Sequence, residues 1–195
     1  MCASVKRSPG YSLTELVVAL AVAIILIAVG LPAFLRAYHS YQLSNAATQV
    51  KDMMLLTRYE AIRLNKPINC IIQPSATNPG MTSLWADSIV NNLLDPTEKT
   101  ILLGNSGNLV DSGTVPGTPT LFTALGSLVP TAPSPSGSAV QFDARGAVIP
   151  PTNVTVFYLA SSVAPEAGYR AVLLLPAGSV QVWTSDASGN WQQQQ

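Results

Sequence analysis

Residues Leu16–Leu35 form an uncharged, mostly apolar run, which constrains the fold more than any other feature of the sequence. As a helix, these 20 residues would span roughly 30 Å, the thickness of the hydrocarbon core of a bilayer. Lys6 and Arg7 precede the run, as expected for a single-pass segment whose basic end stays in the cytoplasm. The sequence therefore predicts a membrane-spanning helix.

A secretory signal peptide is the simplest alternative, because it also has a basic start and an apolar middle. The run is longer than the usual apolar region of such a peptide, and it lacks a good small-x-small cleavage site at its far end. A plain single-pass anchor would explain the run itself. Neither alternative explains Glu15, an acid at the edge of the run, or Gly10, which precedes it.

The carboxylate of Glu15 would be costly at the membrane edge unless it is paired, and such a charge marks function by default. Cutting the chain after Gly10 would create a positive partner, the α-amino group of Tyr11, four residues before Glu15. One helix cannot readily fold its own terminus onto that side chain, whereas a neighbouring subunit can offer its amine. We therefore predict that Glu15 acts in subunit assembly.

The N-terminal region resembles the type IV pilin and pseudopilin family, whose members have a short basic leader ending in Gly, an aromatic residue or Met next, and a Glu at the fifth mature position. Gly10, Tyr11 and Glu15 match these positions, and Pro32 matches a Pro that the family often has twenty-two residues after the cut. Tyr11 departs from the usual Phe, and Thr14 replaces a common Ile.

This resemblance implies that an aspartyl prepilin peptidase of the inner membrane removes residues 1–10 by cutting between Gly10 and Tyr11. It also implies that the peptidase methylates the new amine of Tyr11, and that Glu15 pairs subunits in a filament. Other pilins or pseudopilins, the peptidase and an inner-membrane assembly platform would be the partners.

A second helical pattern follows the apolar run and ends at Asn65-Lys66-Pro67. Its apolar residues recur with helical spacing on one face, at Leu43, Ala46, Ala47, Val50, Met53, Met54, Thr57, Ala61 and Leu64. We therefore expect a transmembrane segment at 11–35 and an amphipathic segment at 36–66, forming one helix of about 50 residues. Gly30 and Pro32 are its predicted kink, because proline removes a backbone hydrogen bond.

Beyond Pro67 the pattern changes to short β-type runs, several of them separated by Gly- or Pro-bearing turns. The predicted strands are Ile68–Ile72, Thr100–Leu103, Ala139–Phe142, Val154–Leu159, Ala171–Leu175 and Ser179–Thr184. A Gly- and Pro-rich loop is expected over 104–137, with a short strand around 120–125, and the tail 192–195 is expected to be disordered. The predicted fold is α+β, a long N-terminal helix packed on a 67–195 domain of antiparallel sheets.

The order of these strands and turns also resembles one branch of the family, the minor pseudopilin H and minor pilin T-type proteins (GspH/FimT-like). Phe142, Gly146 and Gly178 are the matching positions. Each has a structural interpretation that we favour: a core aromatic residue and two turn glycines. DNA-binding members of that branch carry basic residues after the last turn, but this chain has no Lys or Arg from Ala171 onward, so nucleic-acid binding is not expected.

The sequence shows no pattern typical of an enzyme or of a metal or cofactor site. Asp143 and Arg145 are best interpreted as a turn acid and an exposed cation, and His39 has no nearby acid. Cys70 would have no intramolecular partner once a leader containing Cys2 is removed, so no disulfide is predicted. The 10 basic and 10 acidic residues cancel, and no overall charge would attract a polyanion.

The function predicted from these features is that of a minor pseudopilin in the periplasmic pseudopilus of a type II secretion system, which exports folded proteins. The chain would cross the bacterial inner membrane once, with its head domain in the periplasm. The alternative is a minor type IV pilin at a pilus tip, acting in adhesion or DNA uptake. A membrane-tethered enzyme is not expected.

Overall fold

The computed structural model describes residues 12–75, 77, 81–103, 110–111, 130–131, 138–151, 154–161, 164–186 and 190–194. Its contacts divide the chain into two compact units, Met1–Ala37 and Tyr38–Gln195, and each unit is described separately below.

Helix α1 covers Leu13–Leu64, 52 residues in all, and contributes to both units. The expectation of one helix of about 50 residues is therefore confirmed. The helix ends in a hydrogen-bonded cap: Asn65 has a φ of 49°, its N–H donates to Ile62 O, and Lys66 N–H donates to Ala61 O. This pairing is the Schellman arrangement, which satisfies the last carbonyls of a helix, and Pro67 cannot continue the helix.

The helical part of the first unit is apolar and fully exposed. By length and composition α1 is the one described helix that could cross a membrane, and no residue of its most apolar window is buried. Leu26 is 68% exposed and Phe34 66% exposed, for example. A signal sequence near an N-terminus would have the same length and composition.

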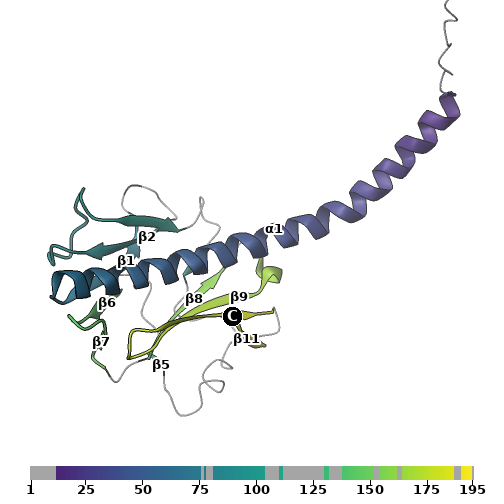
Figure 1. The fold of residues 1–195 in the computed structure, drawn as a ribbon. Helices are drawn as coiled ribbons and strands as arrows, with labels where there is room; N and C mark the ends of the chain where they lie inside the picture. The colour runs from purple at the N-terminus through teal and green to yellow at the C-terminus, as the bar shows by residue number, and fades with distance from the viewer. Residues whose placement is uncertain are drawn as a thin grey trace, which may run out of the picture. The chain divides into compact units, whose positions relative to one another are not determined.

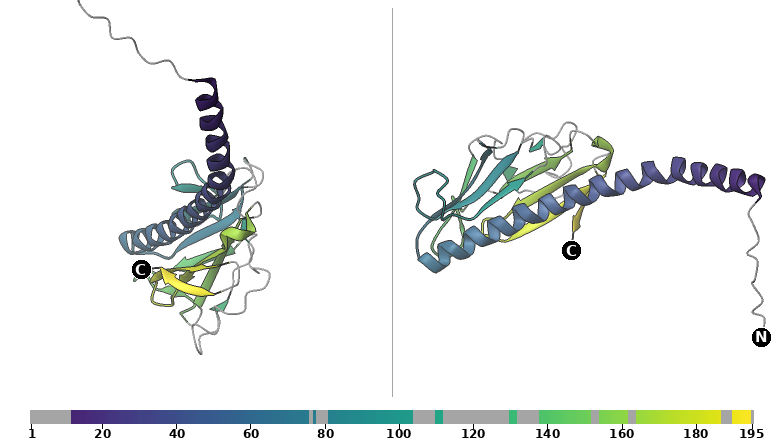
Figure 2. Two further views of the ribbon diagram at one scale, coloured as in Figure 1. Left: turned by 90° about the vertical axis from the view of Figure 1, so that its right-hand side faces the viewer. Right: turned by 90° about the horizontal axis from the view of Figure 1, so that it is seen from above.

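The second unit holds two β-sheets, which lie along the 38–64 part of α1 (Figures 1 and 2). The first sheet has the strand order β3 (Thr100–Leu103), β2 (Thr82–Asp87), β1 (Ile68–Pro74), β6 (Ser138–Phe142), β7 (Val148–Ile149). The second has the order β11 (Trp191–Gln194), β10 (Val180–Ser185), β9 (Tyr169–Leu174), β8 (Val154–Ala160), β4 (Val110–Asp111), with β5 (Pro130–Thr131) also on β8. All described pairings are antiparallel except that of β5 with β8. A short 3-10 helix, η1 (Pro165–Ala167), precedes β9.

One hydrophobic core joins α1 to both sheets. The helix contributes one face, and the sheets contribute the alternate residues that point toward it. The core residues include Leu43, Ala47, Val50, Met53 and Met54 from α1. They also include Cys70, Ile72, Leu84 and Phe142 from the first sheet, and Phe157, Leu159, Val172 and Leu174 from the second. The predicted α+β class, a long helix packed on antiparallel sheets, is confirmed. Leu64 is the exception on the predicted helix face, because it is 37% exposed.

The strand predictions match β1, β3, β6, β8, β9 and β10 to within a few residues. Strand β2 was not predicted, and the expectation of a disordered tail is wrong for Gln192–Gln194, which belong to β11. Within the predicted loop 104–137 the structure describes β4 and β5; the short strand expected around 120–125 lies outside the described residues.

The three positions that carried the branch resemblance have structural roles. Phe142 is fully buried in the core. Gly146 and Gly178 stand in the turns after β6 and β9, with φ values of 79° and 78° that favour glycine. The two turns touch, since Val148 N–H donates to Pro176 O at 2.9 Å.

Candidate assembly site at the start of the long helix

Glu15 lies in the first turn of α1 and is exposed. The helix begins at Leu13, and the N–H groups of Glu15 and Leu16 both donate to Ser12 O, at 3.1 and 3.2 Å. The Glu15 carboxylate forms no hydrogen bond or ion pair with another described residue. It is therefore available to a partner at the point where the apolar helix starts.

The start of the helix also offers a purely local explanation of Glu15. Ser12 precedes the helix and Glu15 follows three residues later, which is the Ser-x-x-Glu sequence pattern of a capping box. The structure does not form the box, since the Ser12 hydroxyl lies 2.8 Å from the Thr14 hydroxyl and the Glu15 carboxylate has no partner among the described residues. A carboxylate in the first turn is also favoured by the positive end of the helix dipole, by about 0.3–1 kcal/mol. This pattern is readable from residues 12–15 and was not among the sequence predictions. A test of Glu15 must therefore separate helix capping from pairing between subunits.

Gly10 and Tyr11, the predicted cleavage and methylation positions, lie outside the described residues, as does the whole predicted leader 1–10. Cleavage after Gly10 and methylation of Tyr11 therefore stay predictions. Gly30 and Pro32 both lie inside α1. A Cβ added at Gly30 would meet no atom within 4 Å, so packing inside the chain does not explain that glycine. The kink predicted at these two residues also stays a prediction.

Two polar residues considered as catalytic candidates, Asp143 and His39, have structural partners. Asp143 accepts hydrogen bonds from the N–H groups of Arg145 and Ala147, both at 2.8 Å, and so fixes its turn. His39 contacts the Tyr38 ring edge-on, with 6.0 Å between ring centroids. Among the described residues there is no group of three or more His, Cys, Asp or Glu that could hold a metal ion.

Cys70 is a free cysteine in the core, fully buried between α1 and the first sheet. Burial raises the pKa of its thiol to about 12, and a hydrogen bond with Thr57 offsets only part of that effect. A thiol that stays protonated at neutral pH is neither a good nucleophile nor a metal ligand. Cys70 therefore acts as a small core residue.

Three basic residues at and after the end of α1 have partners within the second unit. Arg63 pairs with Glu60 at 2.6 Å. Lys66 donates to Ser88 O at 2.6 Å, and Arg58 donates to Gly178 O at 3.1 Å. These three cations therefore hold structure within the second unit.

No family model matches this sequence, and no curated protein matches it either. Two crystal structures of the type IV minor pilin FimU from Pseudomonas aeruginosa, in different crystal forms, are similar to the chain, each at 18% identity. One alignment covers 78% of this chain and 98% of FimU, with a TM-score of 0.38. The other covers 80% and 94%, with a TM-score of 0.40. Likeness at this level says nothing about function.

Proposed function

We propose that this chain is a membrane-anchored structural subunit of a type IV pilin-like filament. In this proposal residues 1–10 are a leader that is removed, 11–35 cross the membrane, and 36–66 continue as the helix that carries the 67–195 head domain. One observation carries the proposal: Glu15, exposed and without a partner among the described residues, stands at the first turn of an exposed apolar helix. The same helix continues into a head domain that has its own core.

Within that class we propose a minor pseudopilin of a type II secretion system, anchored in the bacterial inner membrane with its head in the periplasm. The minor pseudopilin H and minor pilin T-type branch is favoured by Phe142, Gly146 and Gly178, whose places in the fold fit the turns on which that resemblance rests. Other pseudopilins, a prepilin peptidase and an inner-membrane assembly platform are the proposed partners. The lack of Lys and Arg after Arg170 weighs against a DNA-holding tip subunit.

The decisive experiment changes Glu15 and measures incorporation into the filament. Cells that produce the neighbouring subunits would carry wild type, Glu15→Gln, Glu15→Asp or Glu15→Leu, and cross-linking would report contact with those subunits. Gln keeps the hydrogen-bonding shape of a capping box without the charge, whereas Asp keeps the charge but shortens its reach. Asp52→Asn is the matched control, because it neutralises another exposed acid on the same helix.

We expect Glu15→Gln and Glu15→Leu to insert into the membrane at least as well as wild type, since each removes a charge from an apolar segment. Incorporation should fall at least about tenfold for both, which corresponds to the loss of about 1.4 kcal/mol of pairing. Glu15→Asp should be incorporated at an intermediate level, and Asp52→Asn should be incorporated as well as wild type. Full incorporation of Glu15→Gln would show that the charge of Glu15 does not recruit this chain to the filament. Cross-linking to pilus subunits, with none to secretion subunits, would favour the alternative of a minor type IV pilin.

A further inference from the structure

The connection from β2 to β3 exposes four aliphatic side chains within six residues. Ile89 is 53% exposed, Val90 44%, Leu93 66% and Leu94 47%. We call these four residues the crest. A group of exposed aliphatic residues on one short loop is unusual for a soluble surface and points to an interaction site.

The backbone of this loop is fixed by buried carboxylates. Asp87, which is fully buried, accepts hydrogen bonds from the N–H groups of Val90, Asn91 and Asn92, at 2.6, 3.1 and 2.8 Å. These bonds hold Val90 at a φ of 62°, a conformation that is strained for a β-branched residue.

A second carboxylate holds the base of the loop. Glu98, which is 9% exposed, accepts from the N–H groups of Ile89 and Asp95, at 3.2 and 3.1 Å. The crest is therefore presented by a pre-organised loop, and little conformational entropy would be lost on binding.

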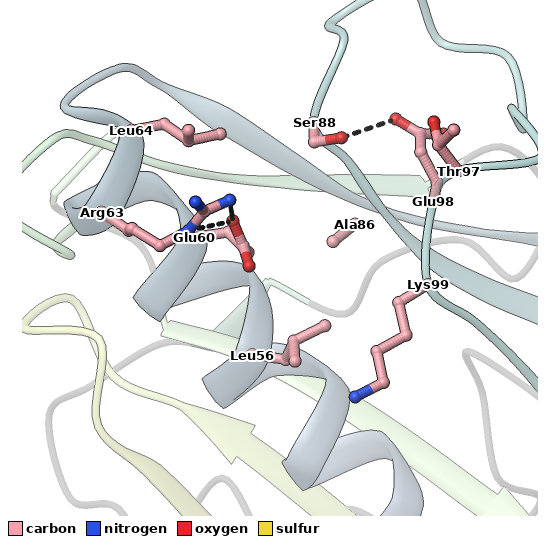
Figure 3. Close-up of a pocket in the computed structure, with 9 residues that line it drawn as sticks. All are labelled: Leu56, Glu60, Arg63, Leu64, Ala86, Ser88, Thr97, Glu98 and Lys99. Atoms are coloured by element: carbon pink, nitrogen blue, oxygen red, sulfur yellow. Dashed lines mark hydrogen bonds and ion pairs between the residues drawn. The ribbon is translucent and has the colours of Figure 1, made fainter.

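A groove lies between the end of α1 and the two ends of the β2–β3 connection, where Ser88, Glu98 and Lys99 line it (Figure 3). Its volume is about 540 Å³, and Leu56, Leu64 and Ala86 form its apolar part. Lys99 lines the groove and points toward the helix near Leu56 (Figure 3). Arg63 is already paired with Glu60, whereas Lys99 forms no ion pair with a described residue.

The crest and the groove are complementary in charge. Asp95 follows the crest, and its Oδ2 accepts a hydrogen bond from Asn91 Nδ2 at 2.8 Å but forms no ion pair with a described residue. The groove combines three apolar residues with polar and charged side chains, among them Glu98 and the ammonium group of Lys99, which is unpaired within the described residues. Because the crest and one wall of the groove belong to the same connection between β2 and β3, two copies can exchange them reciprocally, as a two-fold contact requires.

We propose that a second copy of this chain docks here, with the crest of each copy in the groove of the other and Asp95 paired with Lys99. A lipid surface fits less well, because the Asp95 carboxylate next to the crest would meet anionic headgroups. The contact involves few residues on each side, so it belongs to the small, transient class of interfaces. It is independent of the function proposed for Glu15.

The test uses residues 38–195, which form a compact unit with its own core. Sedimentation velocity at concentrations up to about 1 mM should show a reversible monomer–dimer equilibrium, as expected for a weak contact. Leu93→Lys and Lys99→Glu should each raise the dissociation constant about tenfold or more. Ile149→Lys is the matched control, because Ile149 is 39% exposed at the opposite edge of the same sheet.

Mixing the two variants gives the sharpest result. In a mixed dimer one crest and one groove are unchanged, and the other contact brings a lysine at position 93 against a glutamate at 99. The mixture should therefore dimerise more tightly than either variant alone. A sedimentation coefficient that stays monomeric up to about 1 mM would overturn the proposal. The proposal would also be overturned if Leu93→Lys and Ile149→Lys weakened the dimer equally, or if the mixture of the two variants dimerised no more tightly than each variant alone.

Discussion

Arg58 on helix α1 donates a hydrogen bond from Nη1 to the carbonyl oxygen of Gly178 at 3.1 Å, although 120 positions separate the two residues. Its side chain also lies over Gly146, where an added Cβ would stand 2.8 Å from Arg58 Nε. One arginine thus covers a turn from each sheet. The two glycines leave the space that this stacking needs.

Gly178→Ala should destabilise the head domain more than Gly146→Ala does. Both positions have positive φ, which costs an L-residue about 1–2 kcal/mol. An added Cβ at Gly178 would also strike the carbonyl oxygen of Gly146, which is backbone and cannot move aside. At Gly146 the three nearest atoms are side-chain atoms, Nε and Cγ of Arg58 and Cδ1 of Ile62, which can shift more easily than backbone. Urea unfolding of residues 38–195 measures both changes.

The exposed turn residue Ala177 supplies the control for this comparison. Ala177→Ser should change the free energy of unfolding by less than about 0.5 kcal/mol. If Gly146→Ala proved as costly as Gly178→Ala, the contact between the two turns would not be the cause.

Local signals explain why much of this fold could be predicted from the sequence. The buried face of α1 repeats at helical spacing, and Pro67 marks its end. Strand β2 was missed because both of its faces are buried, so Thr82–Asp87 lacks the alternation that identifies a half-exposed strand. Strand β11 was missed because glutamine is a weak strand former; its pairing with β10 comes from tertiary structure.

Arg170 on β9 is 6% exposed and should tolerate lysine less well than methionine. Among the described residues its guanidinium donates only to neutral oxygens, the Ser44 and Ser40 hydroxyls at 3.0 and 2.8 Å and backbone carbonyls that include Tyr169 O at 2.9 Å. Arg170→Lys would keep a buried charge with fewer donors, whereas Arg170→Met removes the charge.

In urea unfolding of residues 38–195, the free energy of unfolding should fall by about 1–3 kcal/mol in both Arg170 variants, and by more in Arg170→Lys than in Arg170→Met. Ser40 and Ser44 can then turn their hydroxyls to carbonyls of their own helix, which limits the loss in the methionine variant. Greater stability of Arg170→Lys than of Arg170→Met would mean that the charge itself is stabilising.

The buried thiol of Cys70 should make stability fall with pH above about 9. Burial raises its pKa from 9.0 to about 12, so between these values the unfolded chain has released a proton that the folded chain still holds. The contribution of the protonated Cys70 thiol to the free energy of unfolding is complete below pH 9. It is lost as pH rises toward 12, with a slope of at most about 1.4 kcal/mol per pH unit. Urea midpoints at pH 8, 9, 10 and 11 would measure it.

Cys70→Val fills similar space without an ionisable group, so it should remove that part of the pH dependence. The same slope in wild type and Cys70→Val would assign the effect to other residues. In native wild type a thiol reagent at pH 8 should react at Cys70 only on unfolding.

Glu15 could be singled out from the local sequence, whereas the surface displayed by the β2–β3 connection could not. Glu15 was found because an acid at the edge of an apolar run conflicts with its expected environment, and its exposure in the first turn of α1 agrees with that interpretation. The crest at Ile89–Leu94 was not predicted, because neighbouring apolar residues look the same in a sequence whether they are buried or displayed. Only the hydrogen bonds of Asp87 and Glu98 reveal that the loop is held outward.

Processing after Gly10 is the prediction on which the assembly role of Glu15 depends, because the cut creates the amine that Glu15 would pair with. Protein produced together with a prepilin peptidase should yield, by mass spectrometry, a mature chain that begins with N-methyl-Tyr11. Gly10→Val should block the cut, since the family resemblance places the peptidase's chief requirement at that glycine. Glu15→Gln should leave it intact, so that loss of assembly in that variant cannot be blamed on processing. An uncut chain that starts at Met1, or a cut near Ala33 of the kind a signal peptidase makes, would remove the Tyr11 amine and with it the proposed pairing.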